Sequence, residues 1–267
     1  MKPARPVLRY HGGKWRLAPW VIAHFPEHRV YVEPFGGGAS VLMRKQRSYA
    51  EVYNERDGEV VNVFRVLQNP RLAEKLRKLL RVTPFARDEF YKAYKPAKDR
   101  VERARRTIIR SLMGFGSDGV SGEYRTGFRA NAQRSGTTPA HAWGNYPYHI
   151  LHFTDRLQGV VVENRDAIEV VRQHDSPKTL FYVDPPYLHE TRGNDKRYRH
   201  EMTDEDHRRL AACLHSVKGM VVLSGYPSPL YGKLYGGWRT VTRKSLADGA
   251  RPRTECLWLN FNGEAAA

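Results

Sequence analysis

A carboxylate and an aromatic ring that together could hold a nucleobase follow an apolar run in the second half of the chain. Residues 180–183 read Leu-Phe-Tyr-Val, and Asp184-Pro185-Pro186-Tyr187 follows directly. The run predicts a buried strand that ends here, because two consecutive prolines cannot donate hydrogen bonds to a sheet. Open α/β sheets bind their ligands at the carboxyl ends of strands. The pattern therefore predicts a site that grips a planar base by its amino group and its face. The alternative is a solvated aspartate in an ordinary turn.

A glycine-rich turn between a predicted strand and a predicted helix is the second element that could bind a ligand. Its residues are Glu33, Pro34, Phe35, Gly36, Gly37, Gly38, Ala39 and Ser40. Glycine tolerates positive φ and lets a ligand approach the backbone closely. The turn is not a P-loop, since no Gly-Lys-Ser/Thr follows, and Val41 replaces the third glycine of a dinucleotide fingerprint. The turn is typical of nucleotide-like cofactors, but it does not favour recognition of a pyrophosphate.

Polar residues at three further places could complete such a site. Tyr10, Gly13 and Lys14 belong to a Tyr-x-Gly-Gly-Lys turn near the amino terminus, which on its own is typical of a surface turn. Glu55 follows a predicted strand at about the place where an acid commonly holds ribose hydroxyls. Asp166 follows another predicted strand. Either acid could instead cap the next helix.

Alternating strands and helices must position these residues. Strands are expected over residues 30–33, 49–53, 159–163, 179–183, 220–224 and 256–261. Helical spacing of apolar residues predicts helices over 58–67 and 204–214, the second with Thr203 as N-cap and Asp206 completing a capping box. This alternation predicts an α/β fold with an open, mostly parallel sheet and helices on both faces.

A basic segment interrupts the alternation from about residue 70 to 158. Residues 71–110 hold fourteen Lys or Arg against five Asp or Glu. Residues 101–115 predict a single basic helix, and the mixed Arg, Tyr, Phe and Asn of 123–131 predict a hairpin that reads bases. The competing interpretation is a solvated basic surface. The residues expected to contact DNA are Arg105, Arg106, Arg110, Tyr124, Arg125, Arg129, Asn131 and Arg134.

The overall charge favours the same partner. Lys and Arg number 45 against 28 Asp and Glu in 267 residues, which gives a net charge of +17 and a pI near 10.0. Nucleic acid is the leading partner, and an anionic membrane surface is the weaker rival. No run is long and apolar enough to span a bilayer, and residues 1–6 do not resemble a signal peptide. Cys213 and Cys256 are too few for a disulfide framework or a zinc site and fit a reducing, cytoplasmic setting.

The order of these motifs resembles that of a known family. Tyr-x-Gly-Gly-Lys, Glu-Pro-Phe with glycines, a basic insertion and Asp-Pro-Pro-Tyr are similar to the Dam-like, alpha-group N6-adenine DNA methyltransferases, including solitary and phage-borne members. The likeness covers nearly the whole chain. It implies a Rossmann-like methyltransferase sheet built from residues 1–69 and 159–267, with an inserted, mainly helical DNA-recognition domain over 70–158. Two departures are Ala39, where the family often has glycine, and Glu55, where it often has aspartate.

The resemblance also implies roles for single residues. S-adenosylmethionine would bind the glycine turn together with Tyr10, Gly13, Lys14 and Asp184, with Glu55 on the ribose and Asp166 on the adenine ring of the cofactor. Asp184 and the carbonyl of Pro185 would accept hydrogen bonds from the amine of the target adenine, and Pro186 and Tyr187 would complete the base site. Such contacts would favour a pyramidal nitrogen aligned for in-line methyl transfer. The target base must leave the duplex stack, and Tyr187 would then stack on it. Neither a covalent enzyme intermediate nor a metal is needed.

The predicted function is transfer of a methyl group from S-adenosylmethionine to N6 of a flipped adenine in double-stranded DNA, in a bacterial or phage-encoded, nucleoid-associated cytoplasmic enzyme. A methyltransferase acting on RNA or on cytosine N4 is one alternative. A catalytically silent DNA-binding regulator on the same fold is another. A nicotinamide-dependent oxidoreductase is disfavoured by the missing third glycine. A monomer and a homodimer, including a dimer on DNA, are both compatible with the sequence.

Overall fold

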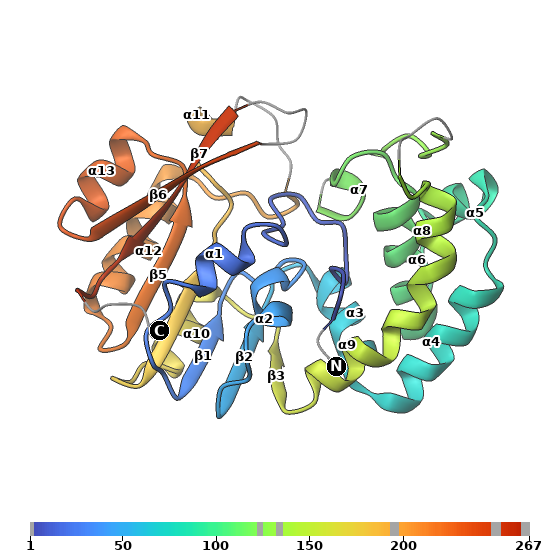
Figure 1. Ribbon diagram of the computed structural model, residues 1–267, viewed down its shortest axis with the longest axis horizontal. Coiled ribbons are helices and arrows are strands. Elements are labelled where there is room, and N and C mark those ends of the chain that lie inside the picture. Colours follow the sequence, from blue (N-terminus) through green and yellow to red (C-terminus); the bar gives the residue numbers. More distant parts are fainter. Residues whose placement is uncertain (1–2, 122–124, 132–135, 193–197, 247–251, 263–267) are drawn as a thin grey trace.

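A seven-stranded sheet forms the centre of the computed structural model, which describes residues 3–121, 125–131, 136–192, 198–246 and 252–262 (Figure 1). The strand order is β3-β2-β1-β4-β5-β7-β6. The strands are β1 (Val30–Glu33), β2 (Ala50–Asn54), β3 (Val160–Glu163), β4 (Thr179–Val183), β5 (Met220–Gly225), β6 (Arg239–Leu246) and β7 (Pro252–Leu259). Strands β1 to β5 are parallel, and β7 runs antiparallel to both of its neighbours. The predicted α/β fold with a mostly parallel sheet is confirmed.

All six predicted strands are present, but the sequence pattern missed β6. The central strands were recognisable because a parallel strand buried on both faces reads as a continuous apolar run, and every residue of β4 is buried. Strand β6 lies at the edge of the sheet, and most of its side chains are exposed. An exposed, charged edge strand has no apolar pattern to detect, and such charges protect an edge from pairing with other chains.

Successive residues of β4 point to opposite faces of the sheet and divide the core in two. Leu180 and Tyr182 join the apolar cluster that contains α1 (Ala18–Ile22), α2 (Ser40–Arg44) and α3 (Gly58–Gln68). Phe181 and Val183 join a second cluster on the other face. That face is covered by α10 (Ala167–Gln173), α12 (Asp204–Ser216) and α13 (Pro229–Tyr235). Helices on both faces are therefore confirmed, as Figure 1 shows.

Helix caps fix where the helices leave the strands. Thr203 caps α12 and forms the predicted capping box with Asp206, so this prediction is confirmed. Asp57 caps α3 by accepting a hydrogen bond from the backbone of Glu59. Asp166 caps α10 through the backbone N–H of Ile168. Because Asp57 and Asp166 each lie just after a strand, the first turns of α3 and α10 begin at the carboxyl edge of the sheet.

The basic insertion forms a helical bundle at one end of the molecule (Figure 1). Its helices are α4 (Pro70–Val82), α5 (Arg87–Lys92), α6 (Arg100–Met113), α7 (Asp118–Ser121), α8 (Pro139–Asn145), the 3-10 helix η1 (Tyr146–His149) and α9 (Ile150–Leu157). The predicted basic helix is confirmed as α6, with Ile108, Ile109 and Leu112 buried. It ends at Met113, two residues short of the expected Phe115, with Gly114 as its C-cap.

The bundle shares its core with one face of the sheet. Leu76, Ile108 and Phe153 of the bundle belong to the same apolar cluster as Leu180 of β4. The amino-terminal segment also crosses onto the bundle, where the backbone N–H of Arg9 donates to Ser111 Oγ over 2.7 Å. The bundle and this face of the sheet therefore share one apolar core. The division of the chain into domains at residues 1–69, 70–158 and 159–267 stays a prediction.

The segment expected to form a base-reading hairpin is attached to the end of α6. Phe128 pairs with Gly114 in an isolated antiparallel bridge. The N–H of Arg129 donates to the carbonyl of Met113 over 2.7 Å, and the N–H of Phe115 donates to the carbonyl of Gly127 over 2.8 Å. In residues 125–131 this pairing to α6 replaces the expected regular hairpin. No helix in the described part of the chain has the length and apolar character that crossing a bilayer requires.

Candidate active site

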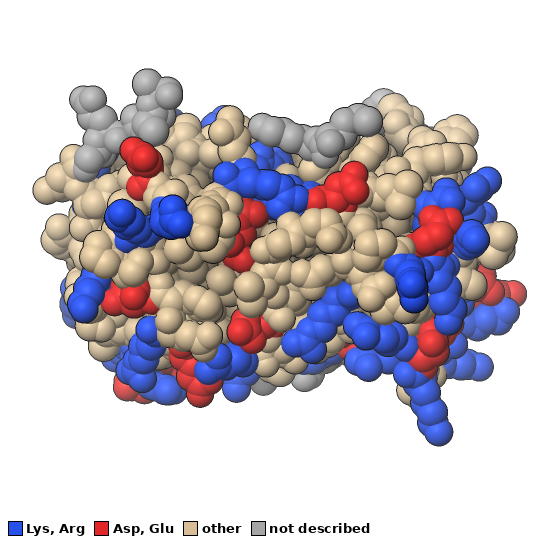
Figure 2. Space-filling view, turned by 90° about the horizontal axis from the view of Figure 1, so that it is seen from below, with Lys and Arg blue, Asp and Glu red and all other residues tan. Residues whose placement is uncertain are grey.

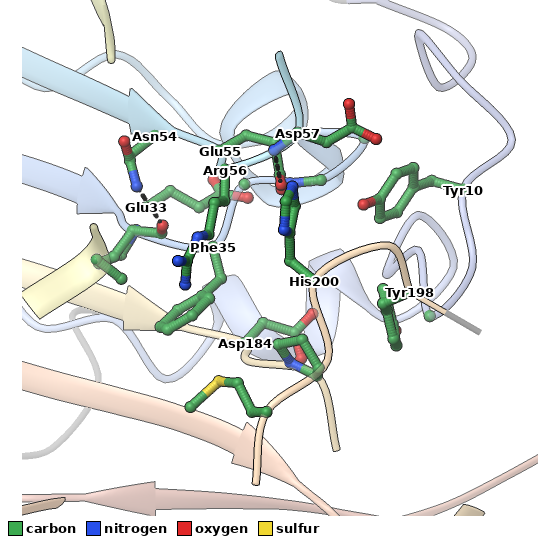
Figure 3. A pocket seen from close by; sticks show the side chains of 18 of the residues that line it. Tyr10, Glu33, Phe35, Asn54, Glu55, Arg56, Asp57, Asp184, Tyr198 and His200 are labelled. Atoms are coloured by element: carbon green, nitrogen blue, oxygen red, sulfur yellow. Dashed lines mark hydrogen bonds between the residues drawn. The ribbon is translucent and has the colours of Figure 1, made fainter. Parts of the chain in front are cut away.

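A cleft lies at the carboxyl edge of the sheet, beside the point where the chain order reverses between β1 and β4. Ligands of doubly wound sheets bind at this place. Counted with the open solvent at its mouth, the cleft has a volume of about 1160 Å³. All but one of the predicted cofactor residues line it: Tyr10, Gly13, Lys14, Glu33, Pro34, Phe35, Gly36, Gly37, Gly38, Ser40, Glu55, Asp166 and Asp184. Figure 3 shows several of these side chains around the cavity.

Two tyrosine rings leave no room for a side chain at two positions of the glycine turn. A Cβ on Gly36 would lie 2.1 Å from the ring of Tyr53, and a Cβ on Gly37 would lie 2.8 Å from the ring of Tyr10. Gly37 also has φ +47°, and its carbonyl accepts a hydrogen bond from Tyr53 Oη over 2.8 Å. The glycines therefore let the turn pack between aromatic side chains, a role that requires no pyrophosphate.

Ala39 is the predicted cofactor residue that does not line the cleft. It is buried, and it precedes α2 with φ 51° and ψ 36°. This left-handed conformation favours glycine, because an L side chain there crowds the following carbonyl oxygen. The position thus explains why glycine is common here in the resembling family. Ala39 shapes the turn from within, which corrects the expectation that it contacts the cofactor.

Glu55 and Asp57, which follow β2, have different structural roles. Glu55 accepts hydrogen bonds from the backbone N–H groups of Gly37 and Asp57, each over 2.9 Å, so it joins the glycine turn to the end of β2. Burial raises the pKa of Glu55 above its usual value. The helix cap is Asp57, not Glu55, and Asp57 also forms a 2.9 Å ion pair with Arg199. Asp166 caps α10 and also lines the cleft, so the helix-cap interpretation is confirmed, and its contact with the adenine ring of the cofactor stays a prediction.

Glu33 is a buried carboxyl group on the wall of the cleft. Its Oε2 accepts hydrogen bonds from Tyr31 Oη over 2.9 Å and from the backbone N–H of Leu42 over 3.0 Å. Burial raises the pKa of Glu33 to about 8, with a smaller contribution from the charge of Asp184. A cationic ligand in the cleft would favour the ionised form, so Glu33 suits a positively charged cofactor.

Asp184 forms a buried ion pair with Lys14. The distance from Lys14 Nζ to Asp184 Oδ2 is 3.0 Å, and the two side chains are 7% and 16% exposed. Burial raises the pKa of Asp184, while the Lys14 ammonium opposes the rise. Burial works against the charged form of Lys14, yet the nearby carboxylates of Asp184 and Glu255 raise its pKa overall. The interpretation of Tyr-x-Gly-Gly-Lys as a surface turn is wrong for Lys14, because its side chain enters the site.

Tyr187 is held firmly on the other side of Asp184. Its hydroxyl lies 3.0 Å from Ser224 Oγ and donates to Glu255 Oε2 over 3.2 Å. The ammonium of Lys14 lies 4.7 Å from the ring centroid, and the ring of Tyr226 contacts it edge-on with centroids 4.7 Å apart. Because Tyr187 is only 8% exposed, stacking on a base requires Lys14 or Tyr226 to move. Stacking by Tyr187 stays a prediction.

Sequence reasoning missed a segment that closes one side of the cleft. Residues 198–202 line it opposite the glycine turn. Figure 3 shows Tyr198 beside Tyr10, and their ring centroids are 6.3 Å apart. Arg199 reaches Asp57, which is distant in the sequence. No local pattern marks these residues, because they reach the cleft only when the chain returns after α11 (His189–Arg192).

The arginines expected on DNA differ in how much of their charge is available. Arg105 donates to Glu102 and Glu89, and Arg106 donates to Glu102 and to two backbone carbonyls. Arg110 is half-buried, and burial lowers its pKa. The guanidinium groups of these three arginines are therefore less available to contact DNA phosphates. Of the others, Arg125 and Asn131 are exposed and Arg129 is half-buried, while Tyr124 and Arg134 lie outside the described residues.

The surface of the helical bundle carries acidic side chains among its basic ones, as expected if the arginines form ion pairs within the protein (Figure 2). Figure 2 shows Lys and Arg crowded over the end formed by the helical bundle, with Asp and Glu among them. Six ion pairs of α4 to α6 join residues three or four apart or neighbouring helices: Arg77 with Glu74, Lys78 with Glu74, Lys92 with Glu89, Arg105 with Glu89, Arg105 with Glu102 and Arg106 with Glu102. The acids of the bundle therefore balance part of the basic charge counted in the sequence.

Fold and site together define the class of protein. A parallel sheet with an antiparallel β7 inserted beside its edge, a glycine turn after β1 and an acid after β4 form a Rossmann-like methyltransferase. The model of the D12 class N6 adenine-specific DNA methyltransferase family matches residues 10–244, most of the chain. The protein belongs to this family, and the match confirms the predicted resemblance, fold and activity, which is methylation of adenine N6 in DNA with S-adenosylmethionine as the methyl donor that the family implies. A comparison with curated proteins found no match.

Proposed function

We propose that the cleft binds S-adenosylmethionine and that Asp184-Pro185-Pro186-Tyr187 presents N6 of an adenine flipped out of double-stranded DNA. One observation carries this proposal. The carboxylate of Asp184 stands at the carboxyl end of β4, on the wall of the cleft. Its Oδ1 is buried without a hydrogen-bond partner of good geometry among the described residues. A buried acceptor of this kind costs free energy until a donor arrives, and the amine of a substrate base is such a donor.

The residues of the cleft suit this cofactor. Bound there, S-adenosylmethionine supplies a methyl group on a positively charged sulfur. Glu33 and Asp184 place two carboxyl groups on the wall of the cleft, where they favour a cation. Glu55, fixed by the N–H groups of Gly37 and Asp57, can still accept hydrogen bonds from ribose hydroxyls, since each carboxylate oxygen accepts two. Asp166, which caps α10 and lines the cleft, would accept a hydrogen bond from the amino group of the adenine ring.

The side chains of the tetrapeptide would act by alignment and charge. The amine of adenine is a weak nucleophile because its lone pair is delocalised into the ring. Hydrogen bonds from that amine to Asp184 and to the carbonyl of Pro185 would favour a pyramidal nitrogen whose lone pair points into the cleft. The same carboxylate would stabilise the positive charge that develops on nitrogen. Asp184 must be ionised to do so, and Lys14 at 3.0 Å favours that form.

The proposal is tested with purified protein, labelled S-adenosylmethionine and plasmid DNA, with single-molecule sequencing to locate modified adenines. Duplex DNA, single-stranded DNA and RNA serve as parallel substrates, and we expect transfer to the duplex. Asp184→Ala should lose at least a hundredfold in transfer rate, as loss of a preorganised electrostatic contact on the order of 3 kcal/mol predicts. Its affinity for the cofactor, measured by calorimetry, should fall far less than the transfer rate, so cofactor binding persists.

The matched control is Asp155→Ala, which removes an exposed carboxylate on α9 far from the cleft. This variant should methylate DNA at the wild-type rate. If Asp184→Ala methylates as fast as the control, the assignment of Asp184 is wrong.

A further inference from the structure

A second groove opens beside the contact between Tyr187 and Tyr226. Tyr226 forms part of its wall, and the ring of Tyr226 contacts Tyr187 with centroids 4.7 Å apart. With open solvent included, the groove has a volume of about 1490 Å³. It lies between α11, the turn before α13, and the β6–β7 hairpin. Its lining residues are Glu190, Thr191, Tyr226, Pro227, Ser228, Pro229, Lys244, Ser245, Arg253 and Thr254.

Two cations of the hairpin line this groove. Lys244 of β6 pairs with Thr254 of β7, and Arg253 of β7 pairs with Ser245 of β6. Because successive residues of a strand point to opposite faces, the two charges lie at neighbouring positions on opposite faces of the hairpin. Within the described ranges neither side chain forms an ion pair, in contrast to Arg105 and Arg106 of the bundle. A cation that is not already paired can neutralise a phosphate without first breaking an internal contact.

The rest of the lining also suits a nucleic-acid backbone. Thr191, Ser228 and Thr254 provide hydroxyl groups, which commonly donate to phosphate and sugar oxygens. The guanidinium of Arg253 lies 5.7 Å from the ring centroid of Tyr226, which orients it at the groove wall. Glu190 is the carboxylate of the lining, so the described lining carries two positive charges against one negative charge.

The position of the groove beside Tyr187 and Tyr226 indicates which part of the DNA it would bind. A base whose amine reaches Asp184 must pass Tyr187, so the sugar and phosphates attached to that base stay outside, next to Tyr226. That is where the groove opens. Figure 1 shows the β6–β7 hairpin and the helical bundle on opposite sides of the segments that carry the cleft. DNA held over the cleft can therefore be contacted by both.

We propose that this groove binds the sugar–phosphate backbone of the strand that carries the flipped adenine, with Lys244 and Arg253 each neutralising one phosphate. The inference rests on the proposed function, since it takes the base to be bound at Asp184. It assigns to the hairpin a DNA contact that the basic composition of residues 70–158 does not supply. The hairpin then grips the strand whose base has left the stack, while the bundle contacts the duplex from the other side.

The test compares the wild-type protein with Lys244→Gln/Arg253→Gln. Each phosphate contact adds about 0.9 to the slope of log affinity against log salt concentration. The double variant should therefore have a slope smaller by about 1.8, and between 50 and 200 mM salt the wild type should lose roughly tenfold more affinity than the variant. Cofactor affinity should be unchanged. Lys178→Gln/Lys218→Gln is the matched control, because it removes two exposed lysines at the opposite, amino-terminal edge of the sheet.

A second measurement locates the contact. The duplex carries the site that the methylation assay identifies, with neutral methylphosphonates replacing the phosphates that flank the target adenine. These should weaken binding by the wild type and by the lysine control, but should weaken the Lys244→Gln/Arg253→Gln protein no further. A double variant with wild-type slope, or one that loses as much affinity to methylphosphonates as the wild type, overturns the inference. Failure of the proposed function looks different, because the wild type itself would then bind cofactor and DNA without methylating adenine.

Discussion

Replacing Lys14 by methionine should move the pH dependence of methyl transfer more than it changes the binding of cofactor. The ammonium of Lys14 lies 3.0 Å from Asp184 Oδ2, and neither side chain is more than 16% exposed. Methionine keeps the length and apolar stem of lysine but removes the charge. Asp184 would then be left as a buried carboxylate with its principal compensating cation gone, and it would bind a proton more readily.

The structure bounds the size of this effect. Two unit charges 3.0 Å apart attract by roughly 5.5 kcal/mol at an effective dielectric constant of about 20. At about 1.36 kcal/mol per pKa unit this equals about four units, which is an upper bound. Solvent at the mouth of the cleft and the positive charge of the cofactor reduce it. We therefore expect the pKa of Asp184 to rise when Lys14 is replaced, by less than this bound.

The assay is kcat/KM for methylation of duplex DNA between pH 5 and 10. Transfer needs ionised Asp184, so the rate increases with pH as the proton leaves that carboxyl group. In Lys14→Met the acid limb should move towards higher pH, with a loss of activity at neutral pH and partial recovery in alkaline solution. Lys14→Arg preserves the charge and should keep the acid limb in place, even if its bulk lowers the rate.

The reasoning about Lys14 is refuted if Lys14→Met loses activity equally at every pH. Such a result would mean that Lys14 contributes packing or cofactor contacts, and that the charge of Asp184 does not depend on it. An unchanged profile with unchanged rate would exclude any part for the ion pair in transfer. Calorimetry with the cofactor distinguishes the first case from a loss of binding.

Two other predictions concern the cleft. Folding raises the pKa of Glu33 from 4.5 to about 8, so between these values the folded protein keeps a proton that the unfolded chain releases. The stability from this group is fully present below about pH 4.5 and is lost as the pH rises through 8, by roughly 4–5 kcal/mol at most. Urea unfolding of the cofactor-free protein should show this decline, and Glu33→Gln should flatten it; an equally steep decline in the variant would contradict the assignment. Arg199→Ala should speed dissociation of the cofactor about tenfold in stopped-flow experiments, because its 2.9 Å ion pair with Asp57 ties residues 198–202 across the cleft. Unfolding should change by about 1 kcal/mol or less, since Arg199 is 34% exposed, and an unchanged dissociation rate would show that the pair does not hold that segment closed.

Much of the catalytic half was predictable because its signals are local. An apolar run of four residues followed by two prolines defines the end of β4 whatever surrounds it, and so Asp184 could be placed at the carboxyl edge of the sheet. The same holds for the capping box of Thr203 and Asp206 and for the buried stripe of α6. In each case the interacting residues lie within one helical turn or one strand.

Other features were not visible in the sequence pattern. The family resemblance placed Lys14 in the cofactor pocket, but the Tyr-x-Gly-Gly-Lys turn alone is typical of a surface turn, and only the approach of β4 places the Lys14 ammonium against Asp184. Arg105 and Arg106 were expected on DNA because of their charge, and this stays a prediction. Both pair with Glu102 within one helical turn, whereas the pairing of Arg105 with Glu89 joins two helices. Strand β6 was missed because an exposed edge strand shows no apolar alternation.

By itself the sequence determined which chemical groups this protein has and the local structure that holds each one: a rigid acid and ring after a strand, a glycine turn before a helix, and a large positive charge. Tertiary structure alone decided which of these groups meet. The pairing of Lys14 with Asp184, of Asp57 with Arg199, and the groove of the β6–β7 hairpin all join segments far apart in the chain. Their geometry follows from how the sheet is ordered and how its two apolar faces are covered, and burial then decides which charges stay available for a ligand.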